Sequence, residues 1–574
     1  MANFKTPGVY IQEISRLPAS IAPVATAIPA FVGYTEKAEP DGKALETITP
    51  VRITSLLEYE QVFGGPFPEI FEVTIDDPLS GEVNPDISVI PEDPGLSPYL
   101  MYYQLRMYFG NGGGPCYVVS VDNYNDSGPT ANHIKESDLS AGINICEEID
   151  EITLLVVPEA IVLESTKRKI INDALVTQCN KLKDRFAIID VFSDPAKTVT
   201  EDGDDFRNEI GADYLRYGAA YYPALRSALI YYYKDSDVTI IDERGNNGFF
   251  NNSKLNNLID NSLQPEAAKA SITIKNNSSG EVIIINGHSF EISSAGTKAE
   301  KAEELKSDIV NELADILEAE VDDVTINLTA KTMGSSGNTI AINYPANDTS
   351  RLEIEPFSGG HDSADHQLYN LIKKKIEAES KLNLYPSAAM AGVYARTDRD
   401  RGVWKAPANV SLRLVESPMK LISSEEQGPL NVDSNTGKSI NVIRKFHQKG
   451  TMVWGARTLA GNDNEWRYVP VRRLFIFIEE SVKKATEPVI FEPNDANTWV
   501  KTKGMIENFL SGLWRDGALA GATQEQAFFV KAGLGETMSA LDILEGKMII
   551  EIGIAAVRPA EFIILRFMHK LQES

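Results

Sequence analysis

The strongest constraint on the fold is a strand, a helix and a second strand in succession between residues 152 and 194. The three segments read ITLLVVPEA, TKRKIINDALVTQCNKLKD and RFAIIDVFSD. Both strands are apolar over several consecutive residues, which is typical of strands that are buried on both faces. Parallel strands need a long crossover connection, and the helical segment supplies one. The sequence therefore predicts a partly parallel central sheet with helices around it, an α/β arrangement.

Other segments of the same region extend this sheet. LSPYLMYYQLRMYFGNGGGPCYVVSV predicts a helix, a glycine turn and a buried strand, and residues 56–63 predict a short helix that ends at Gly64. Residues 67–97 are acidic and rich in proline, so we expect an exposed loop there. We assign residues 23–265 and 347–460 to one core domain.

Residues 266–346 have the pattern of a small inserted surface domain between two loops rich in Asn and Asp. ITIKNNSSGEVIIINGHSFEI predicts one hairpin, and VTINLTAKTMGSSGNTIAINY predicts another. The segment between them predicts an amphipathic helix. Thr297 and Glu300 form a capping box at its start. Its apolar residues recur at helical spacing, so they lie on one face. They are Ala302, Leu305, Ile309, Leu313 and Ile316.

Residues 461–574 predict a separate α+β domain. RYVPVRRLFIFIEES is expected to be a strand, and residues 498–517 a helix with apolar residues at helical spacing. Two further strands, FFVKAGL and KMIIEIGIAAV, precede a terminal strand, RPAEFIILRF. The whole chain is therefore predicted to be an α/β and α+β multidomain protein, 574 residues being enough for several cores.

The charge balance excludes some classes of partner. Lys and Arg number 55 against 82 Asp and Glu, which gives a formal net charge of −27. Such a chain repels phosphate backbones and anionic lipid surfaces, so we expect no nucleic acid partner. The apolar runs are too short to insert into a membrane, and we expect assembly in the bacterial cytoplasm. The three cysteines, Cys116, Cys146 and Cys179, form no CxxC pair and are expected to be reduced or buried.

The sequence contains only weak signals for a catalytic or metal site. The glycines of residues 109–115 lack the Lys and Ser/Thr of a phosphate loop and predict a tight turn. His361 and His366 lie five residues apart with no third ligand close in sequence. Asp398 and Asp400, in an expected polar loop, each adjoin an Arg, so structural salt bridges are favoured over acid–base chemistry. We expect no enzyme, cofactor or metal, and an envelope-acting hydrolase that uses Asp398 and Asp400 is a remote alternative.

Read in order, a series of segments resembles the contractile tail sheath family, the outer sleeve of contractile phage tails, R-type bacteriocins and contractile injection systems. The run from residue 386 to 409 and the last hundred residues are the most specific. The opening MANFKTPGVYIQEIS leans toward phage-like injection particles. The segments are TPGVYIQEI, LLEYEQVFGGP, LMYYQLRMYFGNGGGPCYVV, DRFAIIDV, YYPAL, PSAAMAGVYARTDRDRGVWKAPAN, INVIRKFHQKGTMVWGARTL, RYVPVRRLFIFIEES and GIAAVRPAEFIILRF.

This resemblance implies a subunit that polymerises helically around an inner tube and contracts to drive the tube through a target envelope. In the family, terminal arms donate strands to the C-terminal domain of neighbouring subunits, so that several chains complete one sheet. Residues 1–22 would be one arm, and residues 558–568 would hold the other exchange strand. The implied contact residues are Val9, Tyr10, Ile11, Ile14, Phe562, Ile563, Ile564, Leu565 and Phe567.

The resemblance also implies partners. They are further copies of this chain together with paralogous sheath subunits, an inner tube protein, and baseplate and terminal cap proteins. Lys501, Lys503 and Lys547 are candidates for contacts with acidic tube residues, although an ordinary solvated helix face explains them equally well. The particle would be released from the cell or anchored to a membrane. The tail sheath of a contractile bacteriophage is the alternative.

Overall fold

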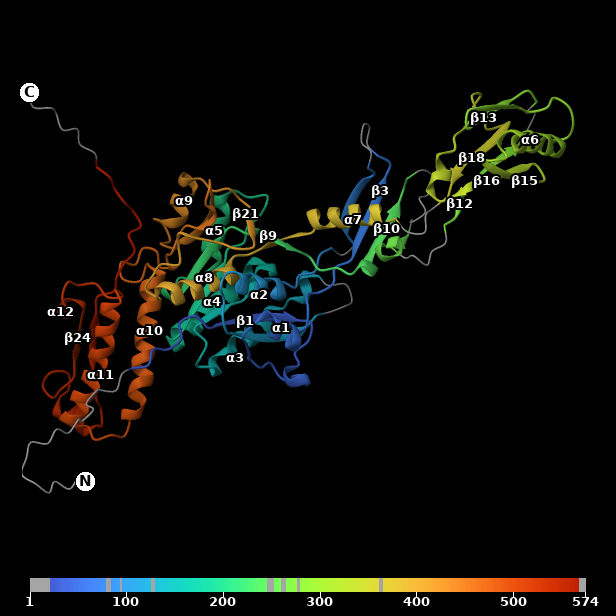
Figure 1. Ribbon diagram of the computed structural model, residues 1–574. Coiled ribbons are helices and arrows are strands. Elements are labelled where there is room, and N and C mark those ends of the chain that lie inside the picture. Colours follow the sequence, from blue (N-terminus) through green and yellow to red (C-terminus); the bar gives the residue numbers. More distant parts are fainter. Residues whose placement is uncertain are drawn as a thin grey trace, which may run out of the picture.

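The computed structural model describes residues 21–78, 84–92, 95–124, 130–244, 252–259, 265–275, 279–360 and 365–566. Figure 1 shows a core in the middle of the molecule, a small domain at one end and the C-terminal domain at the other. The described residues form several hydrophobic clusters, one of which fills the central core and one each of the two end domains. Val9, Tyr10, Ile11 and Ile14 of the predicted N-terminal arm lie outside the described residues.

The core is built on a mixed sheet of strand order β2-β5-β1-β6-β7-β8-β22-β23-β20. The strands from β5 to β22 run parallel, and the outer ones are antiparallel to their neighbours. The prediction of a partly parallel sheet is confirmed. The strands are β1 (Pro29–Thr35), β2 (Val51–Ile53), β5 (Cys116–Asn123), β6 (Leu154–Val156), β7 (Phe186–Asp190), β8 (Gly218–Tyr222), β20 (Val410–Ser411), β22 (Ile440–Phe446) and β23 (Gly450–Val453).

Helices cover both faces of this sheet. Phe31 of β1 contacts the ring of Tyr108 in α2, whereas its neighbour Val32 lies against Gly142 of α3. Adjacent strand residues point to opposite faces, so α2 and α3 lie on different sides. The helices of the core are α1 (Leu56–Phe63), α2 (Met101–Gly110), α3 (Glu136–Ile145), α4 (Ser165–Leu182), α5 (Val199–Glu209), α8 (Ser387–Arg401) and α9 (Ser424–Asn431).

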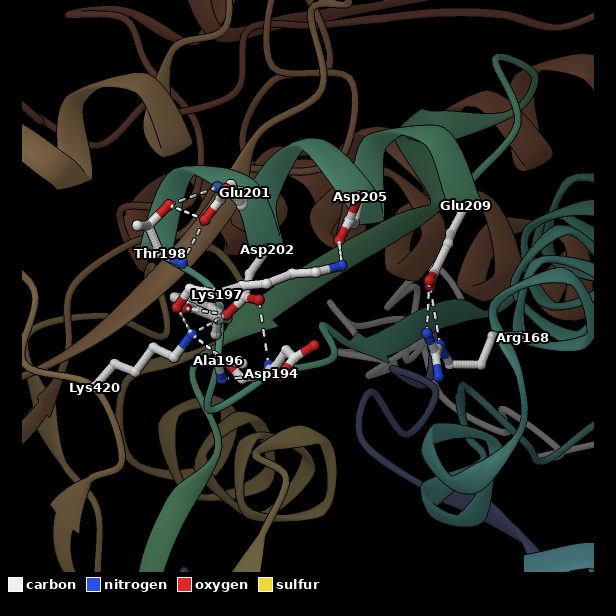
Figure 2. Close-up of polar contacts among 11 residues, drawn as sticks. Arg168, Asp194, Ala196, Lys197, Thr198, Glu201, Asp202, Asp205, Glu209 and Lys420 are labelled. Carbon is white, nitrogen blue, oxygen red and sulfur yellow. Dashed lines mark hydrogen bonds and ion pairs between the residues drawn. The ribbon is translucent and has the colours of Figure 1, made fainter.

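Buried ion pairs hold α5 at both ends, as Figure 2 shows. Near its start, Asp202 accepts a hydrogen bond from Lys420 Nζ at 2.6 Å, and the same ammonium donates to the carbonyl oxygens of Asp194 and Lys197. At its end, Glu209 accepts two hydrogen bonds from Arg168. Both carboxylates are nearly inaccessible to solvent. These contacts fix the loop after β7 and tie it to a distant part of the chain.

Residues 67–97 are not the predicted loop. They contain β3 (Phe71–Asp76) and β4 (Asp86–Pro91), which join β10 (Val238–Asp242) and β11 (Ser253–Lys254) in a second sheet. The prediction was wrong because alternate residues of FEVTID are buried, and this period outweighs the acidic and proline-rich composition. The buried residues pack against α7 (His366–Glu379). A third sheet joins β9 (Leu225–Ile230), β19 (Lys381–Leu384) and β21 (Val415–Pro418).

The small domain at one end contains the predicted amphipathic helix, α6 (Lys298–Leu313), with its Thr297/Glu300 capping box. The first segment predicted as a hairpin contains one, since β13 pairs with β14 across Asn286 and Gly287. The second hairpin prediction is wrong, because β16 pairs with β15 and β12, whereas β17 pairs with β13. β18 pairs with β12, so the unit extends beyond the expected boundary at residue 346. Its strands are β12 (Ala267–Ile274), β13 (Val282–Ile285), β14 (His288–Glu291), β15 (Leu317–Asp322), β16 (Thr325–Met333), β17 (Ile342–Asn343) and β18 (Leu352–Ser358).

The C-terminal domain begins with a helix where we predicted a strand. RYVPVRRLFIFIEES lies largely in α10 (Val469–Thr486), with Pro470 in its first turn, a position where proline is favoured. Leu474, Phe477 and Ile478 enter the core at helical spacing, which the short alternation within FIFIE obscured. The helix predicted at residues 498–517 is confirmed as α11 (Ala496–Arg515). The remaining elements are α12 (Gln524–Ala527), β24 (Phe528–Lys531), α13 (Ala540–Leu544) and β25 (Glu551–Ile554).

Candidate functional site: an open sheet and an exposed terminal segment

The C-terminal domain carries a sheet that has two strands in the described part of the chain. β24 and β25 pair antiparallel, with Phe528 opposite Ile554 and Lys531 opposite Glu551. Phe528 and Val530 are buried on the cluster that includes Ile506 and Leu510 of α11. Every second N–H and C=O of such a strand points away from its partner. Each outer edge is therefore a template for a further strand.

The chain then leaves this sheet as an exposed apolar segment. After β25, Val557 donates its N–H to Ala518 O, and residues 558–566 belong to no strand or helix. Phe562, Ile563, Ile564 and Leu565 are 71–79% exposed. Four consecutive large apolar side chains in water are unfavourable, and such surfaces mark interaction sites. Phe567 lies outside the described residues, so the predicted exchange strand at 558–568 remains a prediction.

The N-terminal end of the described chain reaches the same domain. Ile21 is buried in the cluster of the C-terminal domain, and Val24 packs on it. Val24 donates its N–H to Ser481 Oγ of α10 at 3.2 Å, and Thr26 O accepts a hydrogen bond from Arg473 at 2.7 Å. The N-terminal end of the described chain therefore lies on the C-terminal domain, whereas the C-terminal segment leaves this domain past the start of α10 (Figure 1).

An apolar groove of about 780 Å³ lies next to β25. Met548, Ile550 and Ile552 line one side of it. The segment between α10 and α11 contributes Ile490 and Phe491, of which Phe491 is fully exposed. The unpaired strand edge and an apolar surface thus adjoin each other, which is the combination that an added strand with apolar side chains requires.

The three candidate tube-contact lysines lie on the C-terminal domain. Lys501 is exposed on α11, Lys503 lies 4.0 Å from Glu507, and Lys547 pairs with Glu545 at 2.6 Å. Asn494 donates a hydrogen bond to Lys547 O, which brings the loop after α13 to the start of α11. The structure therefore places these lysines on one end of the domain, and contact with a tube remains a prediction.

Asp398 and Asp400 lie in the last turns of α8 and not in the polar loop that we expected. Asp398 is buried, and both of its oxygens accept hydrogen bonds from Arg473 of α10, at 2.6 and 2.9 Å. Asp400 is exposed and lies 3.3 Å from Arg399. The interpretation as structural salt bridges is confirmed for Asp398, with a partner from the distant α10.

The remaining candidate sites are the histidines, the glycine turn and the cysteines. The described residues contain no cluster of His, Cys, Asp and Glu that could hold a metal ion, and His361 lies outside them. The glycine turn at 109–115 leads into β5, as predicted. All three cysteines are free and buried, and burial raises the pKa of each thiol. None of the helices in the described part of the chain is long and apolar enough to cross a membrane.

The sequence analysis missed one feature of the terminal segment, a contact between Glu561 and the core. Arg457 donates to both oxygens of Glu561, at 2.5–3.2 Å, while Asn431 Nδ2 donates at 2.9 Å and Tyr468 Oη at 3.3 Å. Partial burial opposes ionisation, but the hydrogen bonds from Arg457 and Asn431 prevail and hold the pKa of Glu561 below its usual value. A single glutamate outside any pattern gives no sequence signal for such a contact.

Comparisons with known proteins agree with this architecture. Residues 461–569 match the family described as the phage tail sheath C-terminal domain. A putative prophage major tail sheath protein of Pseudomonas aeruginosa (strain UCBPP-PA14) is 25% identical over 30% of this chain and 43% of its own length. The tail sheath protein of Burkholderia phage BcepMu is 28% identical over 24% of this chain and 29% of its own length. This chain therefore spans less than half the length of these curated relatives.

Solved structures match over nearly the whole chain. The sheath of the extracellular contractile injection system PVC, in its contracted state, is 25% identical with a TM-score of 0.52, covering 99% of each chain. The contracted helical sheath of the anti-feeding prophage is 27% identical with a TM-score of 0.54, covering 99% of this chain and 100% of that one. Over nearly its whole length, the chain is therefore similar to the sheath proteins of contractile injection systems. The resemblance seen in the sequence is confirmed, and residues 461–569 belong to the phage tail sheath C-terminal domain family.

Asp398→Asn should destabilise the subunit by about 3–5 kcal/mol, because Arg473 would be left buried without a carboxylate. We expect a lower melting temperature of the unassembled subunit, measured by calorimetry. Asp400→Asn is the matched control and should change the melting temperature little, since Asp400 is exposed. Equal effects of the two substitutions would contradict the assignment.

Proposed function

We propose that this chain is the structural subunit of a contractile sheath. Copies polymerise helically around an inner tube and later shorten to drive that tube through a target envelope. The observation that carries the proposal is the exposed apolar segment at residues 562–565, which follows a sheet with only two strands in the described part of the chain. The similarity to the contracted sheaths of PVC and the anti-feeding prophage supports it.

Strand exchange between copies accounts for both features together. A segment such as 562–565 that adds to the β24–β25 sheet of a neighbour pairs the open edge and buries its own side chains. Burial contributes roughly 1.5–3 kcal/mol for each large apolar side chain, before the cost of ordering the arm. The N-terminal residues Val9, Tyr10, Ile11 and Ile14 are proposed to do the same from the other end of the chain.

The exchange also sets the symmetry of the assembly. An arm that leaves one subunit and a sheet that receives it on the next form a head-to-tail contact. When each subunit is rotated about an axis and also displaced along it relative to the one before, such contacts repeat without closing into a ring. The product is a helical polymer. An acidic chain with a net charge of −27 stays soluble while such a polymer grows.

Contraction is a switch between two packings of the same subunits. The extended lattice around the tube is metastable, and a signal from the baseplate releases it into a shorter and wider lattice. The free energy is stored in the lattice, so no nucleotide is needed at the moment of firing. The arms remain paired throughout and act as tethers while the subunits rotate.

The proposed partners are the inner tube protein, the baseplate, a terminal cap and other sheath subunits, including paralogues. The particle is assembled in the bacterial cytoplasm and is released or anchored to a membrane. The tail sheath of a contractile bacteriophage is the second candidate, and the phage relative favours it. Capsid and terminase genes beside this gene would establish the phage sheath, whereas their absence would establish the injection system.

Electron microscopy of the purified protein tests the proposed function. We expect hollow ribbed cylinders of uniform width from the full chain. A variant that lacks residues 1–20 should remain folded and soluble, because Ile21 and the C-terminal cluster stay in place, but it should form no cylinders. A full chain that stays monomeric at high concentration, or normal cylinders from the shortened chain, would contradict the proposal.

The double substitution I563D/I564D should abolish cylinders without lowering the melting temperature of the subunit. Successive residues of a strand point to opposite faces, so the pair places a charge on each face of the exchanged segment. Both side chains are exposed in the single subunit, and their loss should not affect its fold. Met333→Asp, at an exposed apolar residue of the small end domain, is the control and should assemble normally.

The triple charge reversal Lys501→Glu, Lys503→Glu and Lys547→Glu should weaken co-sedimentation of the sheath with its inner tube, because it removes the proposed contacts with acidic tube residues. Cylinder formation should persist, since none of these three side chains lines the apolar groove next to β25. A control triple, Lys269→Glu, Lys331→Glu and Lys374→Glu, changes the same charge at exposed lysines elsewhere. Unchanged tube binding by the first triple would leave these lysines as an ordinary solvated surface.

A further inference from the structure

Four hydrogen-bond donors of the core converge on Glu561, at the root of the exposed terminal segment. Two come from Arg457, one from Asn431 and one from Tyr468. The side chain of Arg457 is 4% exposed and that of Glu561 is 21% exposed. Charge-assisted pairs of this kind, with two parallel hydrogen bonds, are among the stronger polar contacts in proteins.

Arg457 is itself held by core residues, independently of the terminal segment. Asn441, which is fully buried on β22, donates to Arg457 O at 2.7 Å and accepts from Arg457 N at 2.7 Å. Arg457 Nη1 also donates to Asn431 O at 3.2 Å, so β22 fixes the backbone of Arg457 and the end of α9 orients its guanidinium. The receiving site for Glu561 is therefore preorganised by residues that the fold already fixes.

The geometry points to Glu561 as the fixed point from which the exchange arm leaves its own subunit. This inference rests on the proposed function, and it adds a residue that the strand exchange does not itself require. Residues 558–561 are held on their own core, and the exchanged segment begins at Phe562. Compared with an arm that is free from residue 558, the reach to the neighbour is shorter by about 13 Å of extended chain.

The position of this clamp determines where a pull on the arm enters the subunit. Arg457 lies between β23 and α10, at the connection of the core with the C-terminal domain. An arm that is clamped there transmits force to the central sheet through β22 and does not pull on the two-stranded β24–β25 sheet alone. Glu561 is thus a positioning residue: it directs the exchange segment and transmits load to the core.

Glu561→Gln tests the clamp, because the variant keeps the side-chain length and loses the charge. In the unassembled subunit, we expect amide hydrogen exchange at Val557, whose N–H donates to Ala518 O just before the clamp, to rise roughly tenfold. The melting temperature should fall less than in Asp398→Asn, because the side chain of Glu561 is 21% exposed and that of Asp398 is 6% exposed. The yield of cylinders should fall by about the same factor, since a freely moving arm is ordered at greater cost. Glu318→Gln, at an exposed residue of β15 in the small end domain, is the matched control and should alter none of these measurements.

The conservative variant Glu561→Asp keeps the charge and should recover part of the yield, which a purely steric role for the side chain would not produce. Wild-type cylinders together with normal exchange and normal yield in Glu561→Gln would overturn the clamp and leave the sheath function intact. A wild-type chain that forms no cylinders would instead overturn the sheath function, while the exchange measurement would still report on the clamp. A melting temperature that Glu561→Gln lowers as far as Asp398→Asn does would show that the residue serves the fold of the subunit and would also overturn the inference.

Discussion

The backbone groups along the free edges of the β24–β25 sheet constrain the rest of the molecule. Backbone N–H and C=O groups that are shielded from water must be paired, and an isolated pair of strands is marginally stable. In this domain, α11 supports one face of the sheet through Phe528 and Val530, while its outer edges carry no further strand in the described part of the chain. The apolar side chains of the segment that follows β25 are exposed to solvent. In the proposed strand exchange, another copy of the chain pairs the edge and buries these side chains.

A second constraint is the rigid junction between the core and the C-terminal domain. Arg473 of α10 is buried, pairs with Asp398 of α8 and lies 4.6 Å over the ring of Tyr394. Asp150 and Lys484 pair at 2.6 Å across the same junction. A buried ion pair with good geometry is costly to break, so these contacts favour a fixed arrangement of the two domains. In the proposed function, the movement of a contracting lattice then falls on the segments that join one subunit to the next.

The sequence predicted the parallel sheet well, because the continuous apolar strands at 154–156 and 186–190 carry a specific signal. It failed where two periods compete: the FIFIE run suggested a strand, although Leu474, Phe477 and Ile478 pack as a helix face. It also failed at β3, where composition obscured a clear alternation. The contact of Glu561 with Arg457 joins residues 104 positions apart and has no local pattern, so only the fold could reveal it.

The central claim is that one sheet is completed by several chains, and a cryo-EM map of the assembled polymer that traces the backbone tests it most directly. We expect residues 562–567 of one subunit, and residues 8–14 of another, to extend the β24–β25 sheet of a third. Their N···O distances to the open edges should be about 2.9 Å. A polymer in which β24 and β25 remain a two-stranded sheet, with subunits joined through side chains alone, would contradict the account.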